Sequence, residues 1–276
     1  MIDLKNINFS YSKRQELIKE LSLTLTPGSI YGLLGRNGAG KTTLLKLIIG
    51  MLFPKSGECL INGKIASKRM PETLQDVFFV PEDFELQGKT TKEFAEIHGK
   101  FYPEFSYSEF TEYLNTFGLT SEKNLKSLSF GQKKQVLLCF GLAVNTKYLI
   151  LDEPTNGLDI PSKEILRRLL ASAINESRSF IISTHQIRDL NNLLDPIIII
   201  NKGKVIFNQN YNTIGEKIAF KTLENIDDNS NILWYEKRFT MYDAICLNTD
   251  NEHTNTDIEM LFKAVTENHK VFENIF

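Results

Sequence analysis

Short apolar runs alternate with amphipathic stretches of helical period through the first 208 residues of the chain. Four of these runs are rich in Ile, Leu, Val or Phe, which predicts buried strands at 30–34, 77–80, 148–151 and 180–185. Stretches of helical period predict helices at 42–49, 133–144 and 161–174. Strands that alternate with helices are typical of an α/β fold with a mainly parallel sheet.

An antiparallel β part is predicted beside this sheet. Residues 1–34 alternate between apolar and polar positions, and a further short strand is predicted at 59–63. Two more apolar runs, 197–200 and 205–207, are joined by a Lys-Gly turn and predict a closing hairpin.

The pattern becomes helical from Thr90 to about Asn145, which predicts a helical subdomain, about residues 88–146, inserted between strands of the core. Each of its first two helices is expected to bury one apolar face. The two faces comprise Phe94, Ile97 and Phe101, and Phe110, Leu114 and Phe117. Gly118 stands where a helix C-cap is expected.

The character of the chain changes near Asn208. The remainder, residues 209–276, is polar, rich in Asn, Asp and Glu, and contains the single tryptophan, Trp234. A helix from about 257 to 266 is its last clear element. We therefore expect a core domain at 1–208 and a small C-terminal α+β appendage at 209–276.

Bulk composition narrows the class of protein. The 276 residues are 42% hydrophobic and 24% charged, which suits one large domain with an appendage. A net charge of −2 without a long basic block argues against a dedicated nucleic-acid binder. Cys59, Cys139 and Cys246 are far apart and are expected to be reduced thiols used as small apolar residues. No signal peptide and no apolar run of membrane-spanning length is expected.

The segment between the predicted strand at 30–34 and the helix at 42–49 carries the first candidate chemistry. Residues 35–42 are Gly-Arg-Asn-Gly-Ala-Gly-Lys-Thr. The glycines let successive backbone N–H groups face an anion, and the helix start adds partial positive charge. In such a loop Lys41 reaches the β- and γ-phosphates, and the Thr42 hydroxyl is a ligand for Mg²⁺. Taken alone, the segment is also compatible with an ordinary glycine-rich turn.

Two of the predicted parallel strands lead into polar residues: Asp152 and Glu153 follow one, and His185 ends the other. Parallel sheets bind ligands at the carboxyl ends of their strands, so these groups are expected to meet residues 35–42. A structural histidine and a chance pair of acids are the alternatives. Tyr11 is either an ordinary strand residue or an aromatic that stacks on a purine.

These residues, with others in the same order, resemble the ATP-binding subunit of ABC transporters over roughly residues 1–208. Residues 35–42 are similar to the Walker A loop, and the strand ending at Asp152 with Glu153 after it is similar to Walker B. Residues 128–132 (Leu-Ser-Phe-Gly-Gln) resemble the family signature. The other matching features are a D-loop at 156–159 (Asn-Gly-Leu-Asp), the switch histidine at His185 and the adenine-stacking aromatic at Tyr11.

The resemblance implies a P-loop NTPase core, with ATP and Mg²⁺ as cofactors. It places Mg²⁺ on Thr42 and Asp152, with Glu82 as a candidate further ligand. Glu153 would be the general base that polarises the attacking water, and His185 would contact the γ-phosphate. The implied nucleotide-binding residues are Tyr11, Gly35, Arg36, Asn37, Gly38, Ala39, Gly40, Lys41, Thr42, Thr43, Glu82, Ser129, Gly131, Gln132 and Asp159.

The resemblance also implies partners. Ser129 and Gly131 would act on the nucleotide of a second ATP-binding subunit, in a homodimer or heterodimer that closes on ATP. Separate transmembrane permease subunits would convert this motion into transport, with the ATPase at the cytoplasmic face of the membrane. The helical subdomain and the loop around Glu82 would form the docking surface for the permease. An isolated subunit would then bind ATP but hydrolyse it poorly.

Two positions depart from the family pattern. Glu82 follows the strand at 77–80 where the family usually has glutamine. Val80-Pro81-Glu82 resembles a subset of exporter-type ATPases, and the additional carboxylate adds repulsion beside Asp152 and Glu153. Gln135 stands where the signature helix often has arginine, which removes one charge.

Two other classes of function remain to be distinguished from an exporter ATPase. One is a soluble ABC-type ATPase that acts on ribosomes or DNA. Relatives of that kind resemble tandem duplicates or carry long insertions, whereas this chain has one P-loop and neither insertion. The other is a non-enzymatic nucleotide sensor, against which the complete set of Lys41, Asp152, Glu153 and His185 argues.

Overall fold

A six-stranded sheet forms the centre of the molecule. The structure is a computed structural model that describes residues 1–12, 16–190, 193–226 and 231–276. The strand order is β10-β9-β3-β8-β7-β6, and every neighbouring pair is parallel except β9 with β10. The bounds are β3 (Ile30–Leu34), β6 (Val77–Val80), β7 (Tyr148–Asp152), β8 (Ser179–Thr184), β9 (Ile197–Asn201) and β10 (Lys204–Gln209).

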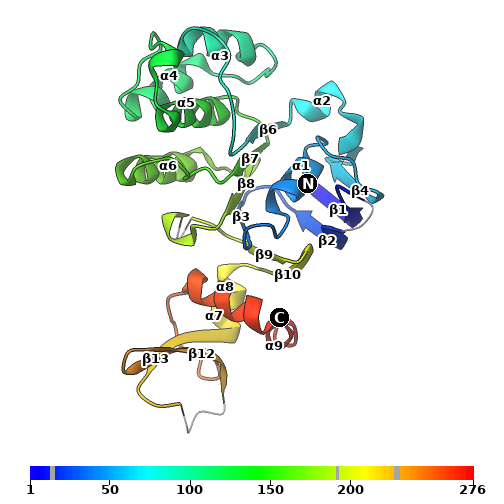
Figure 1. The fold of residues 1–276 in the computed structure, drawn as a ribbon, viewed down its shortest axis with the longest axis vertical. Coiled ribbons are helices and arrows are strands. Elements are labelled where there is room, and N and C mark those ends of the chain that lie inside the picture. The colour runs from blue at the N-terminus through cyan, green and yellow to red at the C-terminus, as the bar shows by residue number, and fades with distance from the viewer. Residues whose placement is uncertain (13–15, 191–192, 227–230) are drawn as a thin grey trace.

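A four-stranded antiparallel sheet lies beside it, in the order β2-β1-β4-β5 (Figure 1). Its strands are β1 (Ile2–Phe9), β2 (Ile18–Leu25), β4 (Ser56–Ile61) and β5 (Lys64–Ile65). Strands β1 and β2 mix buried and exposed positions as predicted for this part, whereas β3 at 30–34 is buried throughout and belongs to the central sheet; residues 13–15 lie outside the described part. Helix α1 (Lys41–Ile48) packs between the two sheets, with Leu44, Leu45 and Leu47 buried.

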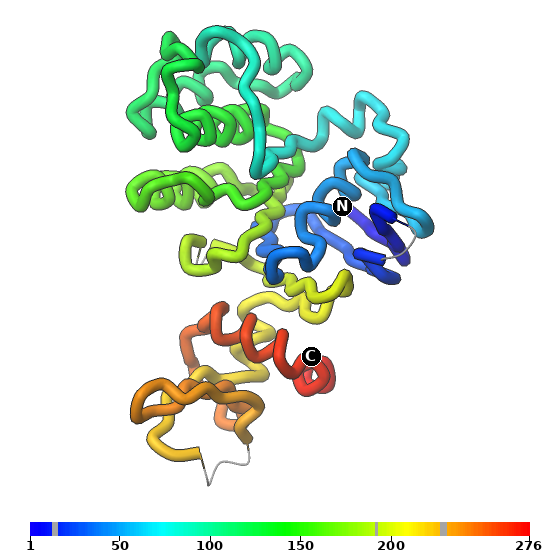
Figure 2. The backbone as a smooth tube through the Cα atoms, viewed as in Figure 1, coloured from blue at the N-terminus to red at the C-terminus, as the bar shows by residue number. Residues whose placement is uncertain are grey.

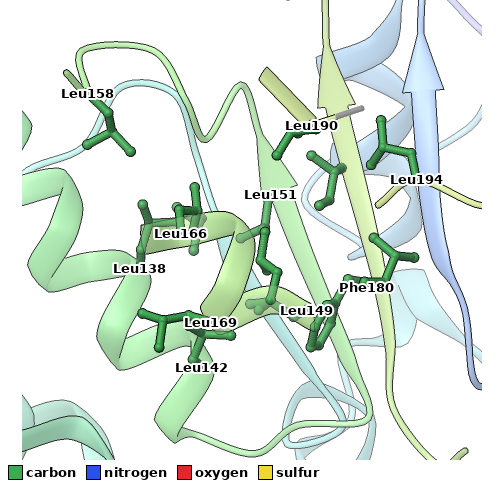
Figure 3. Packing of buried hydrophobic residues seen from close by; sticks show 14 of the residues in the cluster. Leu138, Leu142, Leu149, Leu151, Leu158, Leu166, Leu169, Phe180, Leu190 and Leu194 are labelled. Carbon is green, nitrogen blue, oxygen red and sulfur yellow. The ribbon is translucent and has the colours of Figure 1, made fainter. Parts of the chain in front are cut away.

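The two faces of the central sheet pack against different layers, because successive strand residues point to opposite faces. In β7, Tyr148 and Ile150 face the cluster of α1 and the antiparallel sheet, whereas Leu149 and Leu151 face the other way. Figure 3 shows this second face, where side chains of α5 (Phe130–Ala143) and α6 (Ile160–Ala173) meet β7 and β8. All residues from Val136 to Ala143 are buried, as expected for a helix that is apolar nearly all round.

The helical subdomain contains α3 (Thr91–Gly99) and α4 (Tyr107–Thr116), which pack beside α5 at one end of the molecule (Figure 1). Thr90 and Ser106 cap their N-termini through side-chain oxygens. Phe140 of α5 is fully buried and contacts rings from β6, from α3 and the residues after it, and from α4. These rings belong to Phe78, Phe94, His98, Tyr102, Phe105 and Phe110.

The apolar face predicted for the first helix of the subdomain is wrong. Phe94 is buried, but Ile97 is 40% exposed and Phe101 is 67% exposed. Helix α3 ends at Gly99, so Phe101 leaves the helical period, and Tyr102 and Phe105 contact Phe140 instead. On α4 the prediction holds better, since Phe110 and Leu114 are fully buried. Phe117 is the half-buried C-cap residue, and Gly118 follows it with a φ of +71°, as expected for a glycine that ends a helix.

The C-terminal region packs on the core at the opposite end of the molecule, as the tube in Figure 2 shows. Buried residues of this region, such as Ile214 and Leu261, belong to the same apolar cluster as Leu190 and Leu194 of the core. A three-stranded sheet in the order β11-β13-β12 is flanked by short helices. The bounds are α7 (Tyr211–Lys217), β11 (Ile218–Leu223), β12 (Ile232–Arg238), β13 (Met241–Leu247), α8 (Ile258–Glu267) and α9 (His269–Glu273).

The remaining elements are short: α2 (Pro71–Leu74) and the 3₁₀ turns η1 (Ala66–Lys68), η2 (Leu125–Ser127) and η3 (Ile187–Leu190). The three cysteines are buried and unpaired, as expected for thiols used as apolar residues. Burial raises the pKa of Cys59 to about 12. Among the helices of the described residues, none has both the length and the apolar character needed to cross a bilayer.

The aromatic cluster gives a first prediction. Phe140→Ala removes a fully buried ring and is expected to lower the free energy of unfolding by about 3–5 kcal/mol. The exposed Phe101 provides a matched control, because Phe101→Ala is expected to change the same quantity by about 0.5 kcal/mol or less. Urea unfolding of both variants measures the difference. Equal losses would contradict the central place of Phe140.

Candidate functional site

A cavity of about 380 Å³ opens at the carboxyl edge of the central sheet. Because β3, β6, β7 and β8 run parallel, the loops that follow them meet at this edge. Each of these four loops contributes to the wall. The lining residues are Leu17, Arg36, Asn37, Gly38, Gly40, Lys41, Thr42, Thr43, Glu82, Glu153 and His185.

The loop between β3 and α1 forms one side of this cavity. Gly40 precedes the helix with a φ of +106°, a conformation that favours glycine. Lys41 is only 7% exposed, and its Nζ donates to the Gly35 carbonyl at 2.9 Å. A helix N-terminus, a nearly buried ammonium and a glycine loop together form a site suited to phosphate groups.

Asp152 connects this loop to the neighbouring strands. Its carboxylate is 1% exposed and accepts hydrogen bonds from the Thr42 hydroxyl, at 2.7 Å, and from the Ser183 hydroxyl. A hydroxyl oxygen and a carboxylate oxygen at this separation, beside a phosphate site, are the hard oxygen donors that Mg²⁺ prefers. The residues present therefore fit a magnesium ion held between Thr42 and Asp152.

Glu153 has a backbone conformation that is unusual for a residue other than glycine. Its φ of +46° lies in the left-handed region, which costs a non-glycine residue about 1–3 kcal/mol. The carboxylate is nearly buried, and its Oε1 lies 3.4 Å from Lys41 Nζ and 2.9 Å from His185 Nδ1. The backbone N–H of His185 donates to Oε2 at 3.2 Å. The turn thus points an acid into the cavity between a lysine and a histidine.

Glu82 reaches the same cavity from the loop after β6. Its Oε1 accepts from Asn156 Nδ2 at 2.8 Å, and Asn156 Oδ1 accepts from Gln186 Nε2 at 3.2 Å. A polar chain therefore links Glu82 to the residue next to His185. Asn156 belongs to the predicted D-loop, whereas Gln186 is not among the predicted site residues, and its only signal in the sequence is its position beside His185.

Tyr11 lies beyond the end of β1 and is 66% exposed. Its hydroxyl lies 3.1 Å from Thr43 Oγ1, and its ring meets the edge of Phe9 with centroids 5.0 Å apart. An exposed ring beside the first turn of α1 does not fit the alternative of an ordinary core strand residue. Its position is compatible with stacking on a base held above that helix.

The signature residues lie outside this cavity. Ser129 caps α5 by accepting from Gln132 N at 3.2 Å, and the Gln132 side chain accepts from Ser129 N, which completes a capping box. A Cβ at Gly131 would stand 2.5 Å from the Gly157 carbonyl oxygen, so only glycine allows this close approach. Seven of the predicted nucleotide-binding residues are not among those that line the cavity: Tyr11, Gly35, Ala39, Ser129, Gly131, Gln132 and Asp159.

Asp159 and Gln135 both have structural partners. Asp159 caps α6, where its Oδ1 accepts from Ser162 N at 2.9 Å, and hydrogen bonding with the side chain and then the backbone N–H of Ser162 lowers the pKa of its carboxyl. The buried Gln135 donates to Ser162 Oγ at 2.8 Å and so joins α5 to α6 without a charge. The loss of the arginine expected here is therefore accommodated by a neutral bond.

Comparisons with known proteins agree with this geometry. A sequence profile of the ABC transporter family matches residues 18–156. The chain is 33% identical over 199 residues to the ABC transporter ATP-binding protein YtrB of Bacillus subtilis, covering 71% of this chain and 68% of the relative. It is 29% identical over 242 residues to the lantibiotic transport ATP-binding protein SrtF of Streptococcus pyogenes, covering 86% and 100%. A dimeric structure of MJ0796, a bacterial ABC transporter cassette, superposes with a TM-score of 0.67 at 24% identity, covering 76% and 98%.

The position of Lys41 gives a second prediction. Lys41→Ala removes the buried ammonium from the phosphate site and leaves Glu153 without this partner. Loss of a charged hydrogen bond is expected to weaken ATP binding by about 1.5–3 kcal/mol, or roughly 10- to 100-fold. Calorimetric titration with ATP measures this change, with Lys46→Ala on the same helix as the control. Unchanged affinity in Lys41→Ala would contradict the phosphate site.

Proposed function

Because the chain belongs to the ABC transporter family of ATP-binding proteins, and is accordingly an ATPase that binds ATP, we propose that it powers export through separate membrane-spanning permease subunits. The observation that carries this proposal is the single cavity where Lys41, Thr42, Glu82, Glu153 and His185 meet. We assign the ATP-binding domain to residues 1–208, with the helical subdomain at about 88–146. Residues 209–276 form the accessory region.

Phosphoryl transfer depends mainly on positioning and on neutralisation of charge. Lys41 and the backbone N–H groups before α1 hold the β- and γ-phosphates at the mouth of the cavity. The oxygens of Thr42 and Asp152 would hold Mg²⁺, and the ion would supply positive charge against the phosphates. Asp152 is kept ready for this role because the hydroxyls of Thr42 and Ser183 already orient its carboxylate.

Glu153 is the general base of the proposed site. Its left-handed backbone directs the carboxylate into the cavity, where it accepts the proton of the attacking water. His185 lies 2.9 Å from the same carboxylate and orients the water and the γ-phosphate. In the structure Lys41 Nζ also lies 3.4 Å from Glu153, so a phosphate that draws Lys41 away frees the base for water.

The site is half of a composite site in this proposal. Ser129, Gly131 and the N-terminus of α5 contact the nucleotide of a second subunit, since they lie outside the cavity that the same chain forms. The cassette MJ0796, whose fold is similar, has a dimeric structure. Whether the partner is a second copy or a different chain, ATP closes the pair and hydrolysis opens it.

Export is supported by two observations. The run Val80-Pro81-Glu82 resembles exporter-type members, and the relative SrtF is named for lantibiotic transport. The proposed permease docks on the helical subdomain and the loop around Glu82. An apolar cavity of about 310 Å³ between that loop and α3, lined among others by Phe84 and Tyr102, provides a surface for such contact. The ATPase then acts at the cytoplasmic face of the membrane.

A third prediction tests Glu153. Glu153→Gln is expected to lower kcat by about 100- to 10,000-fold, because the amide cannot accept the proton. ATP binding should persist, since the replacement removes a negative charge from the phosphate site. Size-exclusion chromatography with ATP should then show an accumulated dimer. Glu112→Gln, at an exposed glutamate of α4, is the control, and wild-type turnover in Glu153→Gln would remove the base assignment.

The transporter role is tested by a fourth prediction. Affinity purification of the ATP-locked Glu153→Gln chain from native membranes should recover an integral membrane polypeptide in a fixed ratio. Addition of ADP in place of ATP should weaken this recovery if nucleotide closure controls the assembly. Recovery of ribosomal proteins or DNA instead would favour the soluble ABC-type ATPase.

A further inference from the structure

Lys134 is a buried lysine under the loop that carries Glu82. It lies in the second turn of α5 and has no exposed surface. Its Nζ donates to the Pro81 carbonyl at 3.1 Å and to the Glu82 carbonyl at 3.3 Å, and lies 5.4 Å from the centroid of the Phe84 ring. In the described part of the chain its ammonium forms no ion pair. Its polar partners are two backbone carbonyls, and the Phe84 ring lies near it.

Such a position is costly for a lysine. An ammonium loses its hydration on burial, and burial lowers the pKa of Lys134 here, whereas the nearby carboxylates of Glu82 and Asp152 raise it. An apolar side chain of similar length would fill the space without this cost, and such replacements are often neutral or stabilising. Packing alone therefore does not account for a charge at residue 134.

The loop at 81–82 is held from two directions. Lys134 binds its backbone from α5, and Asn156 Nδ2 binds the Glu82 carboxylate from the loop after β7 at 2.8 Å. Glu82 then lines the cavity together with Glu153. Its carboxylate stands where the family usually has a neutral glutamine, so the site carries one more negative charge than that pattern requires.

We propose that Lys134 is a positioning residue for Glu82. It fixes the backbone of residues 81–82 and supplies the buried positive charge that allows a glutamate at the edge of the ATP site. This inference rests on the proposed function, because it concerns the same site. It also gives a physical link between Glu82 and the helix that begins after Ser129.

A set of full-length variants tests this role. Lys134→Met removes the charge, Lys134→Arg keeps it, and Lys92→Met, at an exposed lysine of α3, is the control. Kinetics are measured at a chain concentration where the rate per subunit no longer changes. We expect Lys134→Met to lower kcat by about 10-fold, as for residues that orient a direct ligand, with KM for ATP unchanged within about twofold.

Four further results separate positioning from a structural role. The Tm of Lys134→Met should equal or exceed that of the wild type, because a buried charge is replaced by an apolar group. Amide hydrogen exchange at residues 82–86 should be faster than in Lys92→Met, while the rest of the chain is unchanged. Lys134→Arg should retain kcat. Adding Glu82→Gln to Lys134→Met should recover part of the lost kcat, because it removes the uncompensated charge but does not restore the two backbone hydrogen bonds.

The opposite results overturn the proposal. It fails if Lys134→Met hydrolyses ATP like Lys92→Met, or if its loss of kcat accompanies an equal loss of ATP affinity and a lower Tm that Glu82→Gln does not reverse. If Lys134→Met does not fold, Lys134→Gln, which keeps N–H donors without the charge, decides by the same criteria. A wild-type chain that neither binds nor hydrolyses ATP would instead refute the proposed function.

Discussion

The buried Asp152 carboxylate is the interaction on which the site depends. Its oxygens accept from Thr42, at the start of α1, and from Ser183, near the end of β8, while Asp152 itself ends β7. A buried carboxylate without such donors would cost several kcal/mol, so these bonds hold three segments together. The parallel pairing of β3, β8 and β7 creates the meeting point, and Asp152 fixes its geometry.

Much of the fold and the centre of the site are predictable because their causes are local in sequence. Apolar runs of strand length identify β3, β6, β7 and β8. Asp152 and His185 stand at the ends of β7 and β8, and Lys41 begins the helix that follows β3. The left-handed φ of Glu153 is not predictable in this way, because tertiary contacts impose it against the preference of the residue. The same holds for Lys134, since a lysine in an α-helix is expected at the surface and only the loop above it explains its burial.

The C-terminal region is a second part of the chain that the sequence pattern predicts poorly. Its strands β11, β12 and β13 bury few residues, so their apolar alternation is weak, and only helix α8 is predicted from period alone. Its buried side chains belong to the same apolar cluster as Leu190 and Leu194 of the core. An ion pair adds to this contact, since Arg188 Nε lies 2.6 Å from Glu259 Oε2 of α8. The region therefore covers an apolar surface of the ATPase core just beyond His185 and is more than an attached polar tail.

On the proposed function, the charges around the cavity explain why one subunit alone does not hydrolyse ATP efficiently. Glu82 and Glu153 line the cavity and Asp152 adjoins it through Thr42, so three carboxylates lie at a place that must accept a triphosphate, while Arg36 and Lys41 supply positive charge there. Repulsion at this short range is strong where water is excluded. On the proposed function, Lys134 would offset one carboxylate from behind, a bound cation would offset another, and the N-terminus of a partner's α5 would add positive potential from the open side. Since the acids belong to one chain and part of this compensation would not, hydrolysis would be restricted to the closed pair, and release of the phosphate charge would reopen the interface.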